Sequence, residues 1–186
     1  MLVECGFTRI TTGDGQEFTF QPSLARIARL GSPAGIVQSY ANLHGARCVQ
    51  EARFVLAGLC DQDEVSLLVG ELSEAGWQPG LMGDAEMVII ARHLMQHGIV
   101  GKAQPGKGDG SYSAEFKAHE YIAAARVHLG LSTQDAEALS MTEFQTLFEM
   151  KFPSKDKRRD LPSQESYKDF MAKIRKPKSG TATTAP

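Results

Sequence analysis

Residues 84–98 read DAEMVIIARHLMQHG. Asp84 belongs to the residue types that cap helix N-termini, the apolar segment from Met87 to Met95 follows it, and Gly98 is a typical stop. This pattern predicts a helix. Its combination of a cap, an apolar segment and a terminating glycine is repeated through most of the chain, so the sequence as a whole predicts a mainly α-helical protein.

Toward the N-terminus, further helices are predicted, each bounded by similar signals. One opens at Pro22-Ser23 and stops at Gly31, and Ser32-Pro33 places a cap and an N1 proline before the next, which ends at Gly45. Apolar residues from Val49 to Leu59 predict another. Asp61 or Asp63 is expected to cap a helix that contains Val65, Leu67, Leu68, Val69 and Leu72 and stops at Gly76. Short connections between these helices favour a helical bundle.

The first twenty residues carry a different pattern, which predicts a β-hairpin. Apolar residues alternate with other residues in two runs around a glycine-rich turn that can adopt positive φ. The runs are Val3, Cys5 and Phe7, then Phe18 and Phe20, with Thr12-Gly13-Asp14-Gly15 between them.

After residue 100 the composition changes twice. Residues 101–113 are rich in Gly, Pro and Ser and predict a linker. Helical patterns return from Ala114 to Leu129, after Ser132, and after Ser140, where Ser140 and Glu143 form a capping-box pattern. The expected organisation is a hairpin at 1–21, a helical core at 22–100, a linker at 101–113, C-terminal helices packed on the core at 114–153, and a basic, largely disordered, flexible tail at 154–186.

Charge and composition exclude several classes of protein. The chain of 186 residues has a net charge of -2, but residues 1–154 hold 11 basic and 18 acidic groups, whereas the rest holds nine and four. An acidic body argues against a specific nucleic-acid binder. No apolar run is long enough to span a membrane, and residues 1–5 do not resemble a signal peptide. The cysteines Cys5, Cys48 and Cys60 are expected to be reduced thiols in a cytosol, with Cys48 and Cys60 as buried small hydrophobes.

The residue patterns that could form a metal site or a phosphate-binding loop are incomplete. His93 and His97 have a spacing that can bind zinc, but Leu94 stands where the metalloprotease pattern needs Glu, so both are expected at the boundary of the core. Residues 106–110 read GKGDG without the strand and Lys-Ser/Thr of a phosphate loop. We therefore expect no catalytic residues, no metal site and no cofactor, and a protein that is not an enzyme.

Residues 121–153 begin YIAAARVHLGLSTQDAEALSMTEF. This pattern of helix, Gly-Leu-Ser, short helix and Met-Thr-Glu-Phe helix resembles the tail assembly chaperones of long-tailed bacteriophages. The resemblance covers about a fifth of the chain, and the opening hairpin is less specifically similar.

The resemblance implies a non-catalytic protein that binds the phage tape measure protein and tail tube subunits during tail morphogenesis, in the host bacterial cytoplasm and with possible homo-oligomerisation. The alternatives are a structural minor tail or connector protein that is retained in the virion, and a small hydrolase or nuclease.

A protein-binding face is expected on the last helix of the 114–153 region. An apolar client needs an apolar stripe or groove. The competing interpretation is that the same stripe is core, which is the commoner role of Met and Phe at helical spacing. The residues of this predicted binding face are Met141, Phe144, Leu147 and Phe148, with Tyr121 and Ile122.

Overall fold

The computed structural model of the chain describes residues 3–74, 76–102 and 113–153. Two units are distinguished, 1–151 and 152–186, and nearly all of the described residues belong to the first. The predicted disordered tail at 154–186 and most of the predicted linker, residues 103–112, lie outside the described residues.

The described part of the chain is mainly helical, as predicted. Its α-helices and strands are α1 (Leu24–Arg29), α2 (Pro33–Asn42), α3 (Cys48–Leu59), α4 (Ser66–Val69), α5 (Asp84–Met95), α6 (Ala118–Ala124), α7 (Thr133–Ala138), α8 (Met141–Lys151), β1 (Thr8–Thr11), β2 (Glu17–Phe20), β3 (Glu71–Ser73) and β4 (Gly76–Gln78). A 3-10 turn, Val3–Cys5, precedes β1, and π-helical turns extend α5 (Gln96–Val100) and α6 (Ala125–Leu129).

The N-terminal β-hairpin is confirmed, but its first strand is shifted. β1 begins at Thr8 rather than Val3, and Thr8 pairs with Phe20 in an antiparallel register. The reason lies at Gly6, which adopts a φ of +92° and approaches the side chains of His97 and Pro22 so closely that a Cβ would lie 2.4 Å from that of His97. This bend at Gly6 separates the 3-10 turn from β1, so Val3 and Cys5 do not take part in the hairpin.

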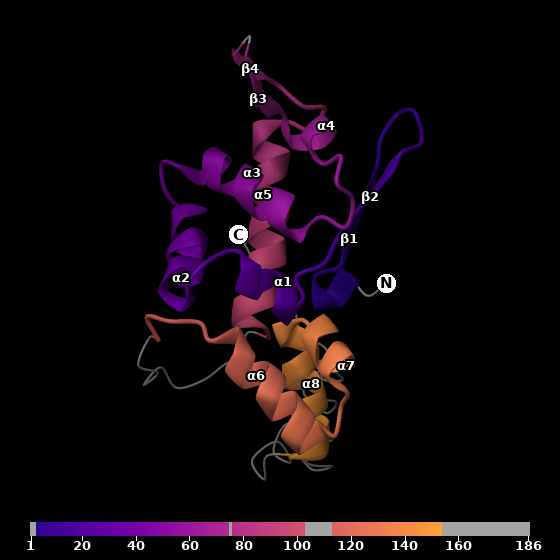
Figure 1. Cartoon of the computed structure of the whole chain (residues 1–186), viewed down its shortest axis with the longest axis vertical. Helices are drawn as coiled ribbons and strands as arrows, with labels where there is room; N and C mark the ends of the chain where they lie inside the picture. The colour runs from indigo at the N-terminus through magenta and orange to yellow at the C-terminus, as the bar shows by residue number, and fades with distance from the viewer. Residues whose placement is uncertain (1–2, 75, 103–112, 154–186) are drawn as a thin grey trace, which may run out of the picture. The chain divides into compact units, whose positions relative to one another are not determined.

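The hydrophobic core lies between helices that are distant in sequence. In Figure 1, α5 runs through the middle with α3 across it, and α6, α7 and α8 group at the end of α5 away from β3 and β4. Phe18 and Phe20 of β2 are fully buried, and backbone hydrogen bonds of 3.0 Å from Gln21 to Leu59 and 2.8 Å from Asp61 to Thr19 fix the hairpin to the end of α3. The largest fully buried side chains are Phe18, Phe20, Leu24, Ile27, Ile36, Leu43, Leu56, Leu59, Leu68, Met87, Leu94 and Met95.

Several predicted helix caps are confirmed. The hydroxyls of Ser32 and Ser132 accept hydrogen bonds from backbone amides three residues later. At the start of α8, the Ser140 amide donates to Glu143 Oε2 over 2.9 Å, and the Glu143 amide donates to Ser140 Oγ over 3.2 Å. These reciprocal bonds form the predicted capping box.

The expected roles of three aspartates as caps are wrong. Gly83 is the N-cap of α5, and Asp84 instead forms an ion pair of 2.9 Å with Arg53 of α3. Val65, rather than Asp61 or Asp63, occupies the N-cap position of α4, and Asp61 pairs with Arg26 of α1. In both ion pairs an arginine from a neighbouring helix holds the carboxylate.

A second β-hairpin replaces the second half of a predicted helix. The apolar spacing from Val65 to Leu72 suggested one helix, but α4 ends at Val69, because Gly70 adopts a φ of +85°. β3 and β4 follow and pair antiparallel, with Leu72 opposite Trp77. Gly80 then passes so close to α4 that a Cβ there would lie 2.2 Å from the Leu68 carbonyl oxygen. Glycine at both positions therefore lets the hairpin fold back on the short helix.

The helix that begins at Asp84 also continues past its predicted stop. Gly98 lies within the π-helical turn rather than after it, where a Cβ would lie 2.6 Å from Ile27 Cδ1 of α1. The backbone turns only at Gly101, with a φ of +77°. Within the described residues, every helix is too short or too polar to cross a lipid bilayer.

Candidate protein-binding surfaces

The predicted binding face is divided between core and surface. Met141 and Phe144 are buried, Tyr121, Ile122 and Phe148 are partly buried, and Leu147 is 38% exposed. On α8, Phe144 contacts Tyr121 of α6 and Phe148 contacts His128 of its π-helical extension, so part of the face joins these helices. Leu147 is the member of the set that projects most into solvent.

Aromatic contacts join the members of this face. Phe116 stacks on Tyr121 with 5.3 Å between ring centroids, and Tyr121 lies edge-on to Phe144 at 5.6 Å. Phe144 and Phe148 are 5.6 Å apart along α8, and His128 lies edge-on to Phe148 at 6.2 Å. Such pairs add to the free energy gained from burial. Through these contacts Tyr121, Phe144 and Phe148, which were predicted to share a face, lie side by side although Tyr121 is distant in sequence from the other two.

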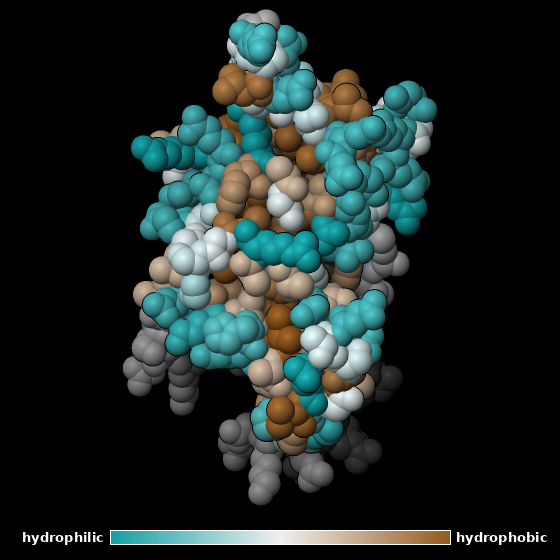
Figure 2. Space-filling model, viewed as in Figure 1, coloured by the Kyte–Doolittle hydropathy of each residue, from teal (hydrophilic) through white to brown (hydrophobic). Residues whose placement is uncertain are grey.

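A different surface carries four large apolar side chains that are exposed. Around α4 and the β3–β4 hairpin, Leu72 is 81% exposed, Leu81 73%, Leu67 48% and Trp77 44%. In Figure 2 this end of the first unit shows apolar surface between polar groups. Exposed apolar surface of this kind is common at protein-interaction sites, so the region is a candidate binding surface.

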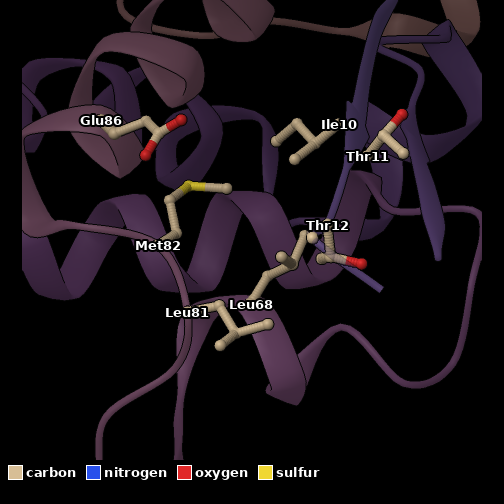
Figure 3. A pocket seen from close by; sticks show the side chains of 8 residues that line it. Ile10, Thr11, Thr12, Leu68, Leu81, Met82 and Glu86 are labelled. Carbon is tan, nitrogen blue, oxygen red and sulfur yellow. The ribbon is translucent and has the colours of Figure 1, made fainter. Parts of the chain in front are cut away.

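Two hollows on this surface share Leu81 as a lining residue. The first, of about 330 Å³, lies between β1, α4 and the start of α5, and the second, of about 310 Å³, lies between α4 and the hairpin. Figure 3 shows Ile10 and Met82 directed toward one another across the first hollow, with Leu68 and Leu81 below them and Glu86 at its edge. We call these two neighbouring hollows together the Leu81 groove.

Backbone hydrogen bonds hold the walls of the Leu81 groove in place. The amides of Leu81 and Met82 donate to the carbonyls of Leu67 and Leu68 over 2.9 and 3.0 Å. These bonds satisfy carbonyls at the end of α4 that have no partner within such a short helix. Leu67 and Leu81 are consequently fixed beside each other, although both are exposed.

Trp77 is anchored beside the groove on the hairpin. The Arg53 guanidinium lies 4.2 Å from its ring centroid and also pairs with Asp84. On the other side, Cζ2 of Trp77 approaches Gly70, where a Cβ would be 2.5 Å away, and Gly70 lines the groove. The indole is therefore in a defined position next to the second hollow.

The sequence pattern did not predict the Leu81 groove, because it placed Leu67 and Leu72 in one helix. A signal was present at Gly70, which interrupts the helical pattern and is a residue type that favours positive φ.

The two histidines lie at the core boundary, as predicted. His97 Nδ1 is 2.8 Å from Thr142 Oγ1 of α8, and the rings of His93 and His97 are 4.6 Å apart. Burial, and to a smaller extent the charge of His93, lowers the pKa of His97. Across residues 3–74, 76–102 and 113–153, no three His, Cys, Asp or Glu side chains come together as a metal site.

The cysteines within the same residues are free thiols, with Cys60 buried and Cys5 and Cys48 half-buried. Burial raises the pKa of the Cys60 thiol, and burial together with Glu143 raises that of Cys5. Both thiols are therefore held in the less reactive protonated form.

A protein-family model, described as a family of unknown function (DUF6246), matches residues 45–169. The chain belongs to this family. The match begins just before α3 and includes α4, both strands of the second hairpin and α5, so most of the Leu81 groove lies within it. Comparisons with curated proteins and with solved structures give no match.

Proposed function

We propose that this member of the DUF6246 family is a non-catalytic tail assembly chaperone of a long-tailed bacteriophage. In this role it binds the tape measure protein and tail tube subunits in the host bacterial cytoplasm while the tail is built. The observation that carries the proposal is the apolar surface around Leu67, Leu72 and Leu81, which is exposed in the single chain. A protein that keeps long apolar helices from aggregating needs such a surface.

The resemblance of residues 121–153 to phage tail assembly chaperones supports the phage assignment. In that region the helices begin at the caps that the resemblance includes, with Ser132 before α7 and the Ser140–Glu143 box before α8. The aromatic contacts of α8 support a scaffold role for Phe144, so client binding is assigned to exposed side chains, including Leu147 and the Leu81 groove.

The composition of phage particles tests the proposal. Infected cells and purified virions are compared by quantitative mass spectrometry, with the tail tube protein as the internal standard. A chaperone is abundant in the lysate and absent from the virion. Retention at a fixed ratio to the tail tube protein would instead identify a minor tail or connector protein.

A further inference from the structure

The region that forms most of the Leu81 groove is acidic. Residues 54–91 contain seven Asp and Glu residues and no Lys, Arg or His. Glu86 lines the first hollow and Glu71 lines the second, and both side chains are exposed. The apolar floor therefore has a carboxylate in each of its two halves.

Two arginines in the described part of the chain, Arg9 and Arg53, are engaged in other contacts. Arg9 lies between Thr8 and Ile10 in β1 and forms an ion pair of 3.4 Å with Glu17. Arg53 is held between Asp84 and the Trp77 ring. Ile10 and Thr11 line the first hollow, and Arg9 is not among its lining residues. Glu71 and Glu86 therefore contribute negative charge at the groove.

We propose that the Leu81 groove binds a basic amphipathic helix of a partner protein. Apolar side chains at helical spacing on the partner contact Leu67, Leu81 and Met82, and Lys or Arg side chains beside them pair with Glu71 and Glu86. This helix belongs to the client of the proposed function, and the inference rests on that function for its biological setting.

Charge complementarity selects this occupant over others. An anionic lipid surface or a nucleic acid would be repelled by Glu71 and Glu86. A second copy of this surface would bring like charges together, which costs binding free energy. A basic partner gains from the same carboxylates, and its apolar face covers the leucines that are exposed in the single chain.

A peptide titration tests this inference with the full chain. The probe is a fluorescein-labelled peptide of 16 residues with leucine along one helical face and lysine at the other positions. Fluorescence anisotropy gives the affinity, and emission from Trp77, the one tryptophan in the chain, reports whether binding occurs near the groove. We expect binding that changes Trp77 emission and weakens as the salt concentration rises.

Variants distinguish this site from general attraction to an acidic protein. Leu81→Ala should weaken binding about tenfold, a typical loss at an interface anchor, without lowering the melting temperature, because the side chain is exposed. Glu71→Gln with Glu86→Gln should weaken binding and reduce its salt dependence. Val127→Ala, which removes apolar atoms from an exposed residue in the π-helical extension of α6, is the matched control and should have no effect.

Three results would overturn the inference: equal affinity for the wild type and Leu81→Ala, equal binding of a peptide with glutamate in place of lysine, or a wild-type dimer that Leu81→Ala dissociates. Binding experiments with the tape measure protein distinguish failure of this inference from failure of the proposed function. If the peptide binds through the groove but the tape measure protein does not bind, the phage role is wrong and the groove stands. If Leu81→Ala binds the tape measure protein as well as the wild type, the groove is wrong and the function stands.

Discussion

Tyr121 lies edge-on to Phe144, with 5.6 Å between the ring centroids and 72° between the ring planes. The contact joins α6 to α8 across residues that are more than twenty positions apart. It assigns Phe144 to the interior of the C-terminal helices rather than to a free surface.

Replacement of Phe144 should therefore destabilise the fold. We expect Phe144→Ala to lower the free energy of unfolding by roughly 3–5 kcal/mol, because it removes a buried ring and leaves a cavity. Leu147→Ala, on the same helix but 38% exposed, should cost less than about 1 kcal/mol. Urea denaturation followed by circular dichroism measures both. Similar losses for the two variants would contradict this division of the helix.

The capping box of α8 provides a second prediction. Ser140→Ala removes the hydroxyl that accepts from the Glu143 amide and should cost about 1 kcal/mol of stability. Glu143→Gln is the matched variant, since an amide oxygen can still accept from the Ser140 amide, and it should cost less. Urea denaturation of both variants checks the order, and a larger loss for Glu143→Gln would count against the box.

The environment of His97 predicts a dependence of stability on pH. Because the pKa of His97 is lowered from its ordinary value of 6.5, the unfolded chain binds a proton at this residue more readily than the folded protein does. This contribution to stability is fully present above about pH 6.5 and is lost as the pH falls toward the lowered pKa. The loss should appear as a falling melting temperature in mildly acidic buffer.

A neutral replacement isolates the contribution of His97. His97→Gln should flatten the decline in melting temperature between about pH 7 and pH 5. His119→Gln, at an exposed position on α6, is the control and should leave the decline as it is in the wild type. An unchanged decline in His97→Gln would assign the pH dependence to other groups.

The backbone at Gly70 predicts a sharp difference between two glycines. Gly70→Ala should destabilise the β3–β4 hairpin, because φ is +85° and a Cβ would clash with Trp77 and with the Gln78 carbonyl. Gly13→Ala is the matched control, because its φ is not positive and nothing lies within 4 Å of its Cβ position. Trp77 emission during thermal unfolding reports on the hairpin directly, and equal melting of the two variants would contradict the account.

Much of the helical fold could be predicted because its signals are local. Ser32, Ser132 and Ser140 cap helices through side chains that reach amides three residues away, so adjacent sequence suffices to find them. Features set by distant contacts could not be predicted in this way. Asp84 turned out to pair with Arg53, and the bend at Gly6 depends on His97, more than ninety residues further on.

The candidate site was predicted only in part for the same reason. Apolar spacing identified Met141 and Phe144 but could not distinguish a core face from a binding face, since both are apolar stripes. Leu67 and Leu81 come together through hydrogen bonds between the end of α4 and the segment after β4. That arrangement requires Gly70 and Gly80, which let the backbone after β4 approach the backbone of α4 closely. The spacing of apolar residues in the sequence cannot predict such an approach.

Co-expression with the tape measure protein tests the central claim most directly. The measured quantity is the fraction of tape measure protein in the supernatant after centrifugation, with wild-type chain, with Leu81→Ala, and with Val127→Ala as the control. We predict that the wild type and Val127→Ala keep most of the client in the supernatant and co-purify with it, and that Leu81→Ala does so poorly. A client that sediments to the same extent with and without the wild-type chain would contradict the claim that this protein is its chaperone.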